Sequence, residues 1–282
     1  MPFVKKTYYE SIGRGFPIIM IPGLGSYNEQ VRFFAEKLSK KGFRIITIDL
    51  PGYGKSKKVL TRRSWSKRIK DIVETEKLQE FGMIGYSNGG LVCLNYIEEF
   101  GNPKFLILIS TPTNTFGRVC LTNLNLIKNF IKENKRKFYS WNAFCEYRTK
   151  KSFTPFVKKE VYENKLFYIK KTGLLKQIYN IWLAFGYKPD FSKINTNVLL
   201  IYGTKDVMVP LNEFKNLSKK IKNVEEVELK DQNHFVLYEK PDEIIKNITK
   251  FCKKVLKSPW RDLNSRPLRY QRSALPLSYR SN

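Results

Sequence analysis

The stretch Gly85-Tyr86-Ser87-Asn88-Gly89-Gly90 joins an apolar segment, residues 81–86, to a segment with helical spacing, residues 88–100. It contains the pattern Gly-x-Ser-x-Gly. A serine on such a strand-to-helix turn projects its hydroxyl at the carboxyl edge of a sheet, and the flanking glycines relieve crowding. The pattern alone leaves a purely structural turn open. Its place after a buried strand makes Ser87 the candidate nucleophile.

Apolar and helical segments alternate on both sides of this turn, which predicts an α/β protein with a mostly parallel, doubly wound sheet. Further strands are expected at residues 17–21, 43–50, 104–110, 197–202 and 224–229. Ser26, with Glu29 three residues later, predicts a capping box for a helix that Gly42 ends. Other helices are expected at residues 64–78 and 211–221, and a closing helix has an apolar face formed by Ile244, Ile245, Ile248, Phe251, Cys252 and Val255.

The alternation stops between about residues 113 and 190, where the sequence is aromatic and lysine-rich and predicts helices but no strand. We therefore expect an α/β core at residues 1–112 and 193–257, and a helical cap insertion at residues 113–192. Residues 258–282 contain five Arg and no Lys, unlike the lysine-rich remainder. They resemble the translated opposite strand of a transfer-RNA gene, which predicts a disordered read-through tail. The alternative is a basic tail that binds nucleic acid.

A serine becomes a good nucleophile only when a base removes its proton. The chain contains one histidine, His234, which follows the last expected strand. Asp206 follows the strand before it and is the candidate that orients the imidazole. The order Ser87, Asp206, His234 is typical of one hydrolase architecture and not of chymotrypsin-like or subtilisin-like enzymes. Asp231 is the alternative acid.

Acyl transfer also requires donors for the oxyanion. The backbone N–H of Asn88, at the start of a helix, is one candidate. The backbone N–H of Leu24, in the loop Pro22-Gly23-Leu24-Gly25, is the second. That loop is equally consistent with an ordinary strand-to-helix turn.

Over residues 3–257 the chain resembles the α/β-hydrolase superfamily. The resemblance rests on the loop at Gly23, the turn at Ser87 and three further motifs, which are Asp49-Leu50-Pro51-Gly52-Tyr53-Gly54-Lys55-Ser56, Gly203-Thr204-Lys205-Asp206-Val207-Met208-Val209-Pro210 and His234-Phe235 with Glu239-Lys240-Pro241. It implies Ser87 as nucleophile, Asp206 and His234 as its partners, and the insertion as a lid. Pro22, Asn88 and Asn233 depart from the usual pattern, so the substrate class cannot be copied from a typical member.

The composition excludes disordered, collagen-like and disulfide-scaffold classes, since 42% of the residues are hydrophobic and 27% are charged. The sequence shows no membrane-spanning run and no signal-peptide core, which predicts a cytoplasmic protein. Its four cysteines are scattered, without metal-ligand spacing. We expect no metal and no organic cofactor.

The net charge is +27, and residues 113–192 alone contain 16 basic and 5 acidic side chains. No zinc-finger, helix-turn-helix or RNA-recognition signature accompanies the charge, so no nucleic-acid partner is expected. The basic insertion instead predicts an anionic or lipid-derived substrate and a weak contact with a membrane surface. The oligomeric state is left open.

These observations predict a serine hydrolase, similar to a carboxylesterase or lysophospholipase, that cleaves a small-molecule carboxylic ester through an acyl-enzyme. Two alternatives remain open at this point. The same three residues could hydrolyse amide, thioester or carbon–carbon bonds, or the fold could serve a non-catalytic binding protein.

Overall fold

The computed structural model describes residues 3–256, apart from residues 6, 25, 51, 58–60, 114–124, 126–127, 133–139, 156, 174 and 176–186. The expected tail at residues 258–282 and Cys120 lie outside the described residues, as does part of the expected insertion. The free thiols of Cys93, Cys145 and Cys252 are buried.

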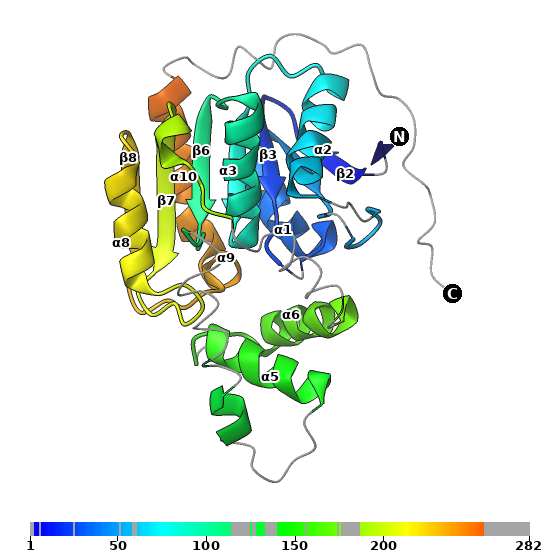
Figure 1. Ribbon diagram of the computed structural model, residues 1–282, viewed down its shortest axis with the longest axis vertical. Helices are drawn as coiled ribbons and strands as arrows, with labels where there is room; N and C mark the ends of the chain where they lie inside the picture. Colours follow the sequence, from blue (N-terminus) through cyan, green and yellow to red (C-terminus); the bar gives the residue numbers. More distant parts are fainter. Residues whose placement is uncertain are drawn as a thin grey trace.

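The described strands form one sheet in the order β1-β2-β4-β3-β5-β6-β7-β8 (Figure 1). β2 pairs with β4 in the antiparallel sense, and every pair from β4 to β8 is parallel. The strands are β1 (Phe3–Val4), β2 (Thr7–Ile12), β3 (Phe16–Ile21), β4 (Phe43–Ile48), β5 (Gly82–Tyr86), β6 (Phe105–Ile109), β7 (Asn197–Gly203) and β8 (Val224–Leu229). The predicted, mostly parallel α/β sheet is confirmed.

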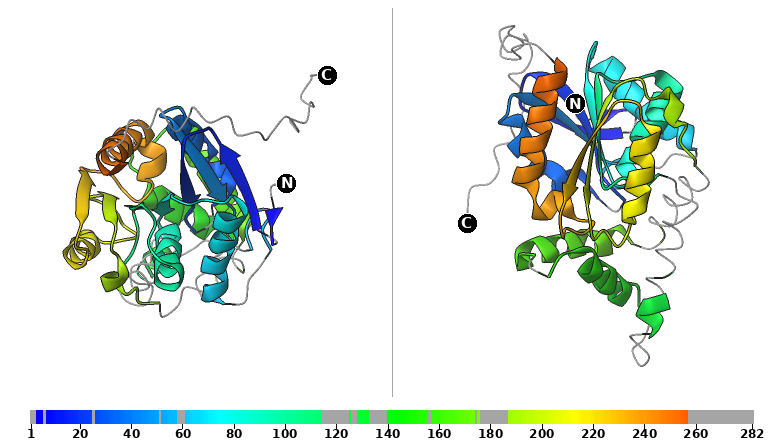
Figure 2. Two further views of the ribbon diagram at one scale, coloured as in Figure 1. Left: turned by 90° about the horizontal axis from the view of Figure 1, so that it is seen from above. Right: turned by 90° about the vertical axis from the view of Figure 1, so that its left-hand side faces the viewer.

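Helices cover both faces of this sheet, as the edge-on view in Figure 2 shows. α1 and α10 pack on one face, and α2, α3 and α8 pack on the other. The helices are α1 (Asn28–Ser39), α2 (Arg62–Thr75), α3 (Asn88–Phe100), α5 (Trp141–Ser152), α6 (Lys159–Thr172), α8 (Leu211–Lys220), α9 (Val236–Glu239) and α10 (Pro241–Leu256), with a short 3₁₀ helix, η1, at Phe191–Lys193.

Alternate side chains of the central strands enter two separate cores. In β6, Leu106 and Leu108 pack with α2, α3 and α8, whereas Phe105 and Ile107 pack with α1 and α10. All four side chains are fully buried. Because both faces are covered, these strands are continuous apolar runs rather than alternating ones.

The first two strands were not expected from the sequence. β2 has the sequence Thr-Tyr-Tyr-Glu-Ser-Ile, and its burial falls from buried at Thr7 to partly exposed at Ile12. A strand near the edge of a sheet buries only part of its side chains, so it lacks the apolar run that marked the central strands. It extends the sheet by antiparallel pairing with β4.

The predicted capping box at Ser26 is wrong. α1 begins at Asn28 after Tyr27, whose side chain makes no capping hydrogen bond. The N-terminus is capped from a distant segment instead, since the Asn28 N–H donates to Asp49 Oδ1 at 2.8 Å. The Ser26 hydroxyl is engaged elsewhere, as it accepts a hydrogen bond from Lys165 Nζ. A cap supplied by the chain after β4 leaves no local sequence signal.

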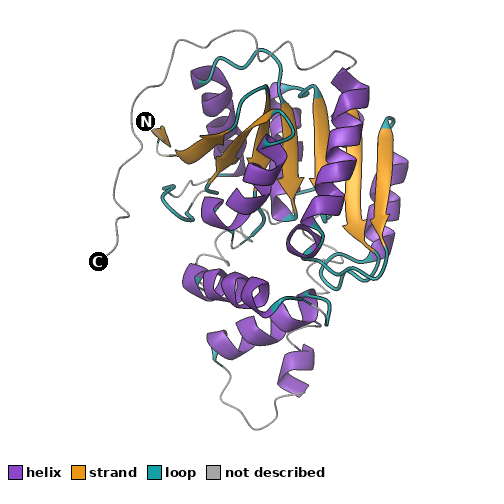
Figure 3. Ribbon diagram, turned by 180° about the vertical axis from the view of Figure 1, so that it is seen from behind, coloured by secondary structure: helices purple, strands orange, loops and turns teal. Residues whose placement is uncertain are grey.

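α5 and α6 lie outside the layered core, beyond the ends to which the arrowheads of the parallel strands point (Figure 3). Both belong to the expected insertion at residues 113–192, and no strand lies in the described part of that range. None of the described helices combines the length and the apolar character needed to cross a membrane.

Candidate functional site

Ser87 lies between β5 and α3 with a φ of +52°, in the left-handed region that non-glycine residues rarely adopt. Glycines on both sides permit this turn. A Cβ at Gly85 would lie 2.4 Å from Gly90 Cα, and a Cβ at Gly89 would lie 2.2 Å from the Ile21 carbonyl oxygen. Such strained backbone persists only where its surroundings enforce it, and it is concentrated at functional sites.

A continuous hydrogen-bonded chain starts at this serine. Ser87 Oγ lies 3.0 Å from His234 Nε2, and His234 Nδ1 lies 2.8 Å from Asp206 Oδ2. His234 and Asp206 are buried, with 5% and 7% exposure. The structure thus brings together three residues that are far apart in the sequence. The arrangement can accept a proton from the hydroxyl onto Nε2 while the carboxylate faces the opposite ring nitrogen.

The Asp206 carboxylate is also held from its other side. Its Oδ1 accepts hydrogen bonds from the backbone N–H groups of Met208 and Val209, each at 2.8 Å. Both oxygens therefore have partners, which fixes the orientation of the carboxylate toward His234. Asp231, the alternative acid, is exposed and forms an ion pair with Lys205 at 2.7 Å. That hydrogen-bonded lysine lowers the pKa of Asp231.

Asn233, noted in the sequence only as unusual, connects three segments at this site. Its Oδ1 accepts hydrogen bonds from the backbone N–H groups of His234 and Val207, at 2.8 and 3.1 Å. Its Nδ2 donates to the Lys151 carbonyl oxygen of α5 at 2.7 Å. One buried amide thus holds the histidine loop, the aspartate loop and α5 together. Its position beside the candidate base was the available signal.

The proposed oxyanion donors lie on two segments that flank Ser87. Asn88 is the first residue of α3, so its N–H is at a helix N-terminus. The loop that contains Leu24 also approaches the serine, because a Cβ at Gly23 would lie 3.1 Å from Ser87 Cβ. Assigning either N–H to an oxyanion remains a prediction.

Aromatic side chains pack around the imidazole. The Tyr86 and His234 rings have centroids 6.0 Å apart and stack at 30°. Tyr238, from α9, packs edge-on against Tyr86 at 6.1 Å. Burial raises the pKa of both phenols. Neither role was predicted, although Tyr86 lies within the motif around Ser87 and Tyr238 directly precedes Glu239 of the last motif.

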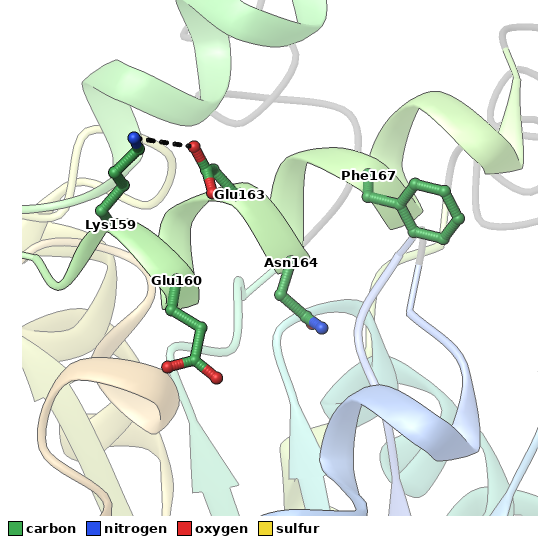
Figure 4. A pocket seen from close by; sticks show the side chains of 5 residues that line it. All are labelled: Lys159, Glu160, Glu163, Asn164 and Phe167. Carbon is green, nitrogen blue, oxygen red and sulfur yellow. Dashed lines mark ion pairs between the residues drawn. The ribbon is translucent and has the colours of Figure 1, made fainter. Parts of the chain in front are cut away.

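Two hollows lie on α5 and α6 and not directly over Ser87. The larger, about 850 Å³, lies between α5 and the start of α6 and is bordered by Asn233, adjacent to His234. The other, about 640 Å³, is formed by five exposed side chains of α6 (Figure 4). Neither hollow includes Ser87, Asp206 or His234 in its lining.

A family model described as the alpha/beta hydrolase fold matches residues 17–168. The chain belongs to the α/β-hydrolase fold family. The match spans the turn at Ser87 and continues into α6, and it agrees with the order of strands described above. The resemblance noted in the sequence is therefore confirmed at the level of the family.

Individual relatives of this α/β-hydrolase are distant. It is 22% identical over 258 residues to the AB hydrolase superfamily protein YisY of Bacillus subtilis, covering 86% of this chain and 94% of YisY. An esterase from Exiguobacterium antarcticum superposes with a TM-score of 0.74 at 19% identity, covering 88% of this chain and 95% of the esterase. A bromoperoxidase from Bacillus anthracis superposes with a TM-score of 0.71 at 20% identity, over 89% and 95% of the chains. At these identities the solved structures establish the fold alone.

Proposed function

We propose that this chain is a serine hydrolase that cleaves a small-molecule carboxylic ester through an acyl-enzyme intermediate. The observation that carries the proposal is the hydrogen-bonded chain from Ser87 Oγ through His234 to Asp206, at 3.0 and 2.8 Å. Membership of the α/β-hydrolase fold family, and an esterase among its structural neighbours, support it.

In the first half of the reaction, Ser87 Oγ attacks the ester carbonyl carbon as His234 Nε2 takes the hydroxyl proton. The N–H groups of Leu24 and Asn88 stabilise the negative charge that develops on the carbonyl oxygen. The tetrahedral intermediate then breaks its bond to the alkoxy oxygen. His234 returns the proton to that oxygen, and the alcohol leaves an acyl group on Ser87.

In the second half, His234 deprotonates a water molecule that attacks the acyl carbon. The bond to Ser87 Oγ breaks, the proton returns to the serine, and the carboxylic acid is released. Asp206 keeps the imidazole in the tautomer whose Nε2 accepts a proton, and it stabilises the imidazolium that forms in each half. We propose residues 113–192 as a lid over this site, because α5 and α6 lie beyond the carboxyl ends of the strands.

The test is Ser87→Ala, assayed on short p-nitrophenyl esters. We expect the variant to lose activity by about 10⁴-fold or more, because the nucleophile is removed, while circular dichroism and thermal unfolding stay those of a folded protein. Ser39→Ala, a serine on α1 away from the site, serves as the matched control and should retain activity. Unchanged hydrolysis by Ser87→Ala would refute the assignment.

Labelling by a fluorophosphonate distinguishes an enzyme from a binding protein of the same fold. A reactive serine should be labelled in the wild type and not in Ser87→Ala. A labelled protein that cleaves amides, thioesters or carbon–carbon bonds in preference to esters would keep the three residues and change the substrate class.

A further inference from the structure

α6 presents a lysine on the side that faces the core. Lys165 is only 2% exposed, and Ile169, one turn later, is also buried. The ammonium donates to Ser26 Oγ at 2.8 Å and to the Tyr238 hydroxyl at 3.2 Å. It also lies 5.2 Å from the centroid of the Phe235 ring. The buried cation is thus held by neutral groups.

These contacts place Lys165 between the two segments that flank the candidate nucleophile and base. Ser26 belongs to the loop whose Gly23 abuts Ser87. On the other side, Tyr238 packs on Tyr86, whose ring stacks on His234. The lysine therefore reaches from α6 to the rim of the site.

A second cation approaches from α5. Arg148 is close enough to Lys165 to lower its pKa, and it also acts on the pKa of Tyr86, the residue that precedes Ser87. Burial in turn lowers the pKa of Arg148. Arg148 thus acts electrostatically on both Lys165 and Tyr86.

Burial makes the charged form of Lys165 unfavourable unless a negative partner lies next to it. Burial and Arg148 together lower its pKa from 10.5 to about 7. Within the described part of the chain, no carboxylate contacts its ammonium, and its two hydrogen bonds use two of three N–H donors. Buried charges are normally paired, so an apolar side chain at this position would give a more stable fold than an unpaired lysine.

We infer that Lys165, together with Arg148, binds a negatively charged oxygen group of the substrate, a carboxylate or a phosphate, next to Ser87. The inference rests on the proposed function for the reacting group and adds the class of substrate. The anion takes the third N–H of Lys165 and supplies the counter-charge that no carboxylate of the described residues provides. The site then favours esters with an acidic acyl or alcohol part over neutral esters of the same size.

The competing explanation is that Lys165 only fastens α6 to the core through Ser26 and Tyr238. The two roles differ in what a substitution changes. A fastening lysine affects neutral and anionic substrates alike, whereas an anion-binding lysine affects the preference between them. The ratio of the activity on anionic substrates to the activity on neutral substrates therefore distinguishes the two roles.

The first experiment compares 4-nitrophenyl hemiglutarate with 4-nitrophenyl pentanoate, which has a similar acyl chain and no charge. A 4-phosphonobutyrate ester replaces the carboxylate by a phosphonate and shows which group is preferred. We expect the ratio of kcat/KM for anionic over neutral ester to fall at least tenfold in Lys165→Met, mainly through KM of the anionic ester. Arg148→Gln should lower the ratio in the same direction.

Lys159→Met is the matched control, because it removes the same charge from an 88% exposed position of the same helix. Its ratio should stay at the wild-type value. A wild type that prefers the neutral ester, or a Lys165→Met variant with an unchanged ratio, would overturn the inference.

A binding measurement keeps this inference separate from the proposed function. Glutarate and inorganic phosphate are titrated calorimetrically into wild type, Ser87→Ala and Lys165→Met. We expect binding to the first two and at least tenfold weaker binding to the third. Binding that depends on Lys165, in a protein whose Ser87 takes no fluorophosphonate, would support the anion site and refute the hydrolase. Labelling of Ser87 without anion binding that depends on Lys165 would support the hydrolase and refute the anion site.

Discussion

Three groups hold the Asp206 carboxylate at once, which makes it the residue through which the site is most easily perturbed without altering its shape. One oxygen faces His234, and the other accepts the N–H groups of Met208 and Val209. A neutral amide of the same size would keep the backbone contact through its carbonyl oxygen and present an N–H to the imidazole. The histidine would then be held in the tautomer that cannot accept the serine proton.

We accordingly expect Asp206→Asn to lower kcat for p-nitrophenyl esters by about 10³- to 10⁴-fold while the protein remains folded. Steady-state kinetics and the rate of fluorophosphonate labelling measure the effect. Asp231→Asn is the control, since Asp231 is exposed and paired with Lys205. If the two variants lost activity equally, the acid would be misassigned.

At the scale of elements, α1 depends on a carboxylate from another part of the chain. Asp49 Oδ1 accepts from the Asn28 N–H, and Oδ2 accepts from the Lys55 N–H at 2.9 Å. Gly54, with a φ of +50°, makes room for it, since a Cβ there would meet Asp49 Oδ2 at 2.1 Å. The loop after β4 and the start of α1 thus form one unit that supports the segment beside Ser87.

Replacing Asp49 by Ala should lower the free energy of unfolding by about 2 kcal/mol, because a helix cap is lost and the buried N–H of Asn28 is left unsatisfied. Urea unfolding followed by circular dichroism measures the change. Asp190→Ala removes a cap from the exposed η1 and should cost about 1 kcal/mol or less. An effect of Asp49→Ala no larger than that of Asp190→Ala would contradict this role.

The central elements were predictable because their signals are local. The buried strands of the core are continuous apolar runs such as Ile18–Ile21, and α3 begins and ends at the residues that the sequence indicated. The cap of α1 and the strand β2, near the edge of the sheet, were missed, since each depends on a partner distant in the chain. A local pattern has no access to such a partner.

The residues of the candidate site also differ in whether their sequence signal is local. Ser87, Asp206 and His234 could be named because each follows a strand whose carboxyl end meets the same edge of the sheet. The roles of Lys165 and Asn233 could not be predicted, because they depend on how α6 and α5 pack against that edge. In the sequence, Lys165 is one of many lysines of the insertion, and only its burial distinguishes it.

At the scale of the whole molecule, the net charge of +27 is less informative than the burial of a single lysine, Lys165. The pKa of Lys165 is about 7 in the folded protein and close to its usual 10.5 in the unfolded chain. Between these two values the unfolded state binds more protons. The contribution of Lys165 to stability therefore becomes more unfavourable as pH falls from about 10.5 to 7, and it is constant below that range.

Lys165→Met should consequently be more stable than the wild type at pH 7, and the difference should shrink as the pH rises toward 10. One pKa unit corresponds to about 1.4 kcal/mol, so the effect is large enough to appear in thermal unfolding. The charge of nearby Arg148 contributes to the lowered pKa of Lys165. In Lys159→Met the difference from wild type should not depend on pH in this way. If the stability of Lys165→Met relative to wild type increased with pH, the lowered pKa of Lys165 would be refuted.

The pairing of β6 with β7 has a consequence for how the chain folds. Phe105 lies opposite Asn197 and Ile109 opposite Ile201, although about 90 residues separate the two strands in the chain. The entropy of closing such a loop grows only with the logarithm of its length, by about 0.6 kcal/mol for each doubling. The entropic cost of forming the ladder between β6 and β7 is thus almost insensitive to the length of the segment between the two strands. The segment that carries Lys165 and Arg148 can therefore lengthen, shorten or be exchanged while the sheet that positions Ser87 folds as before.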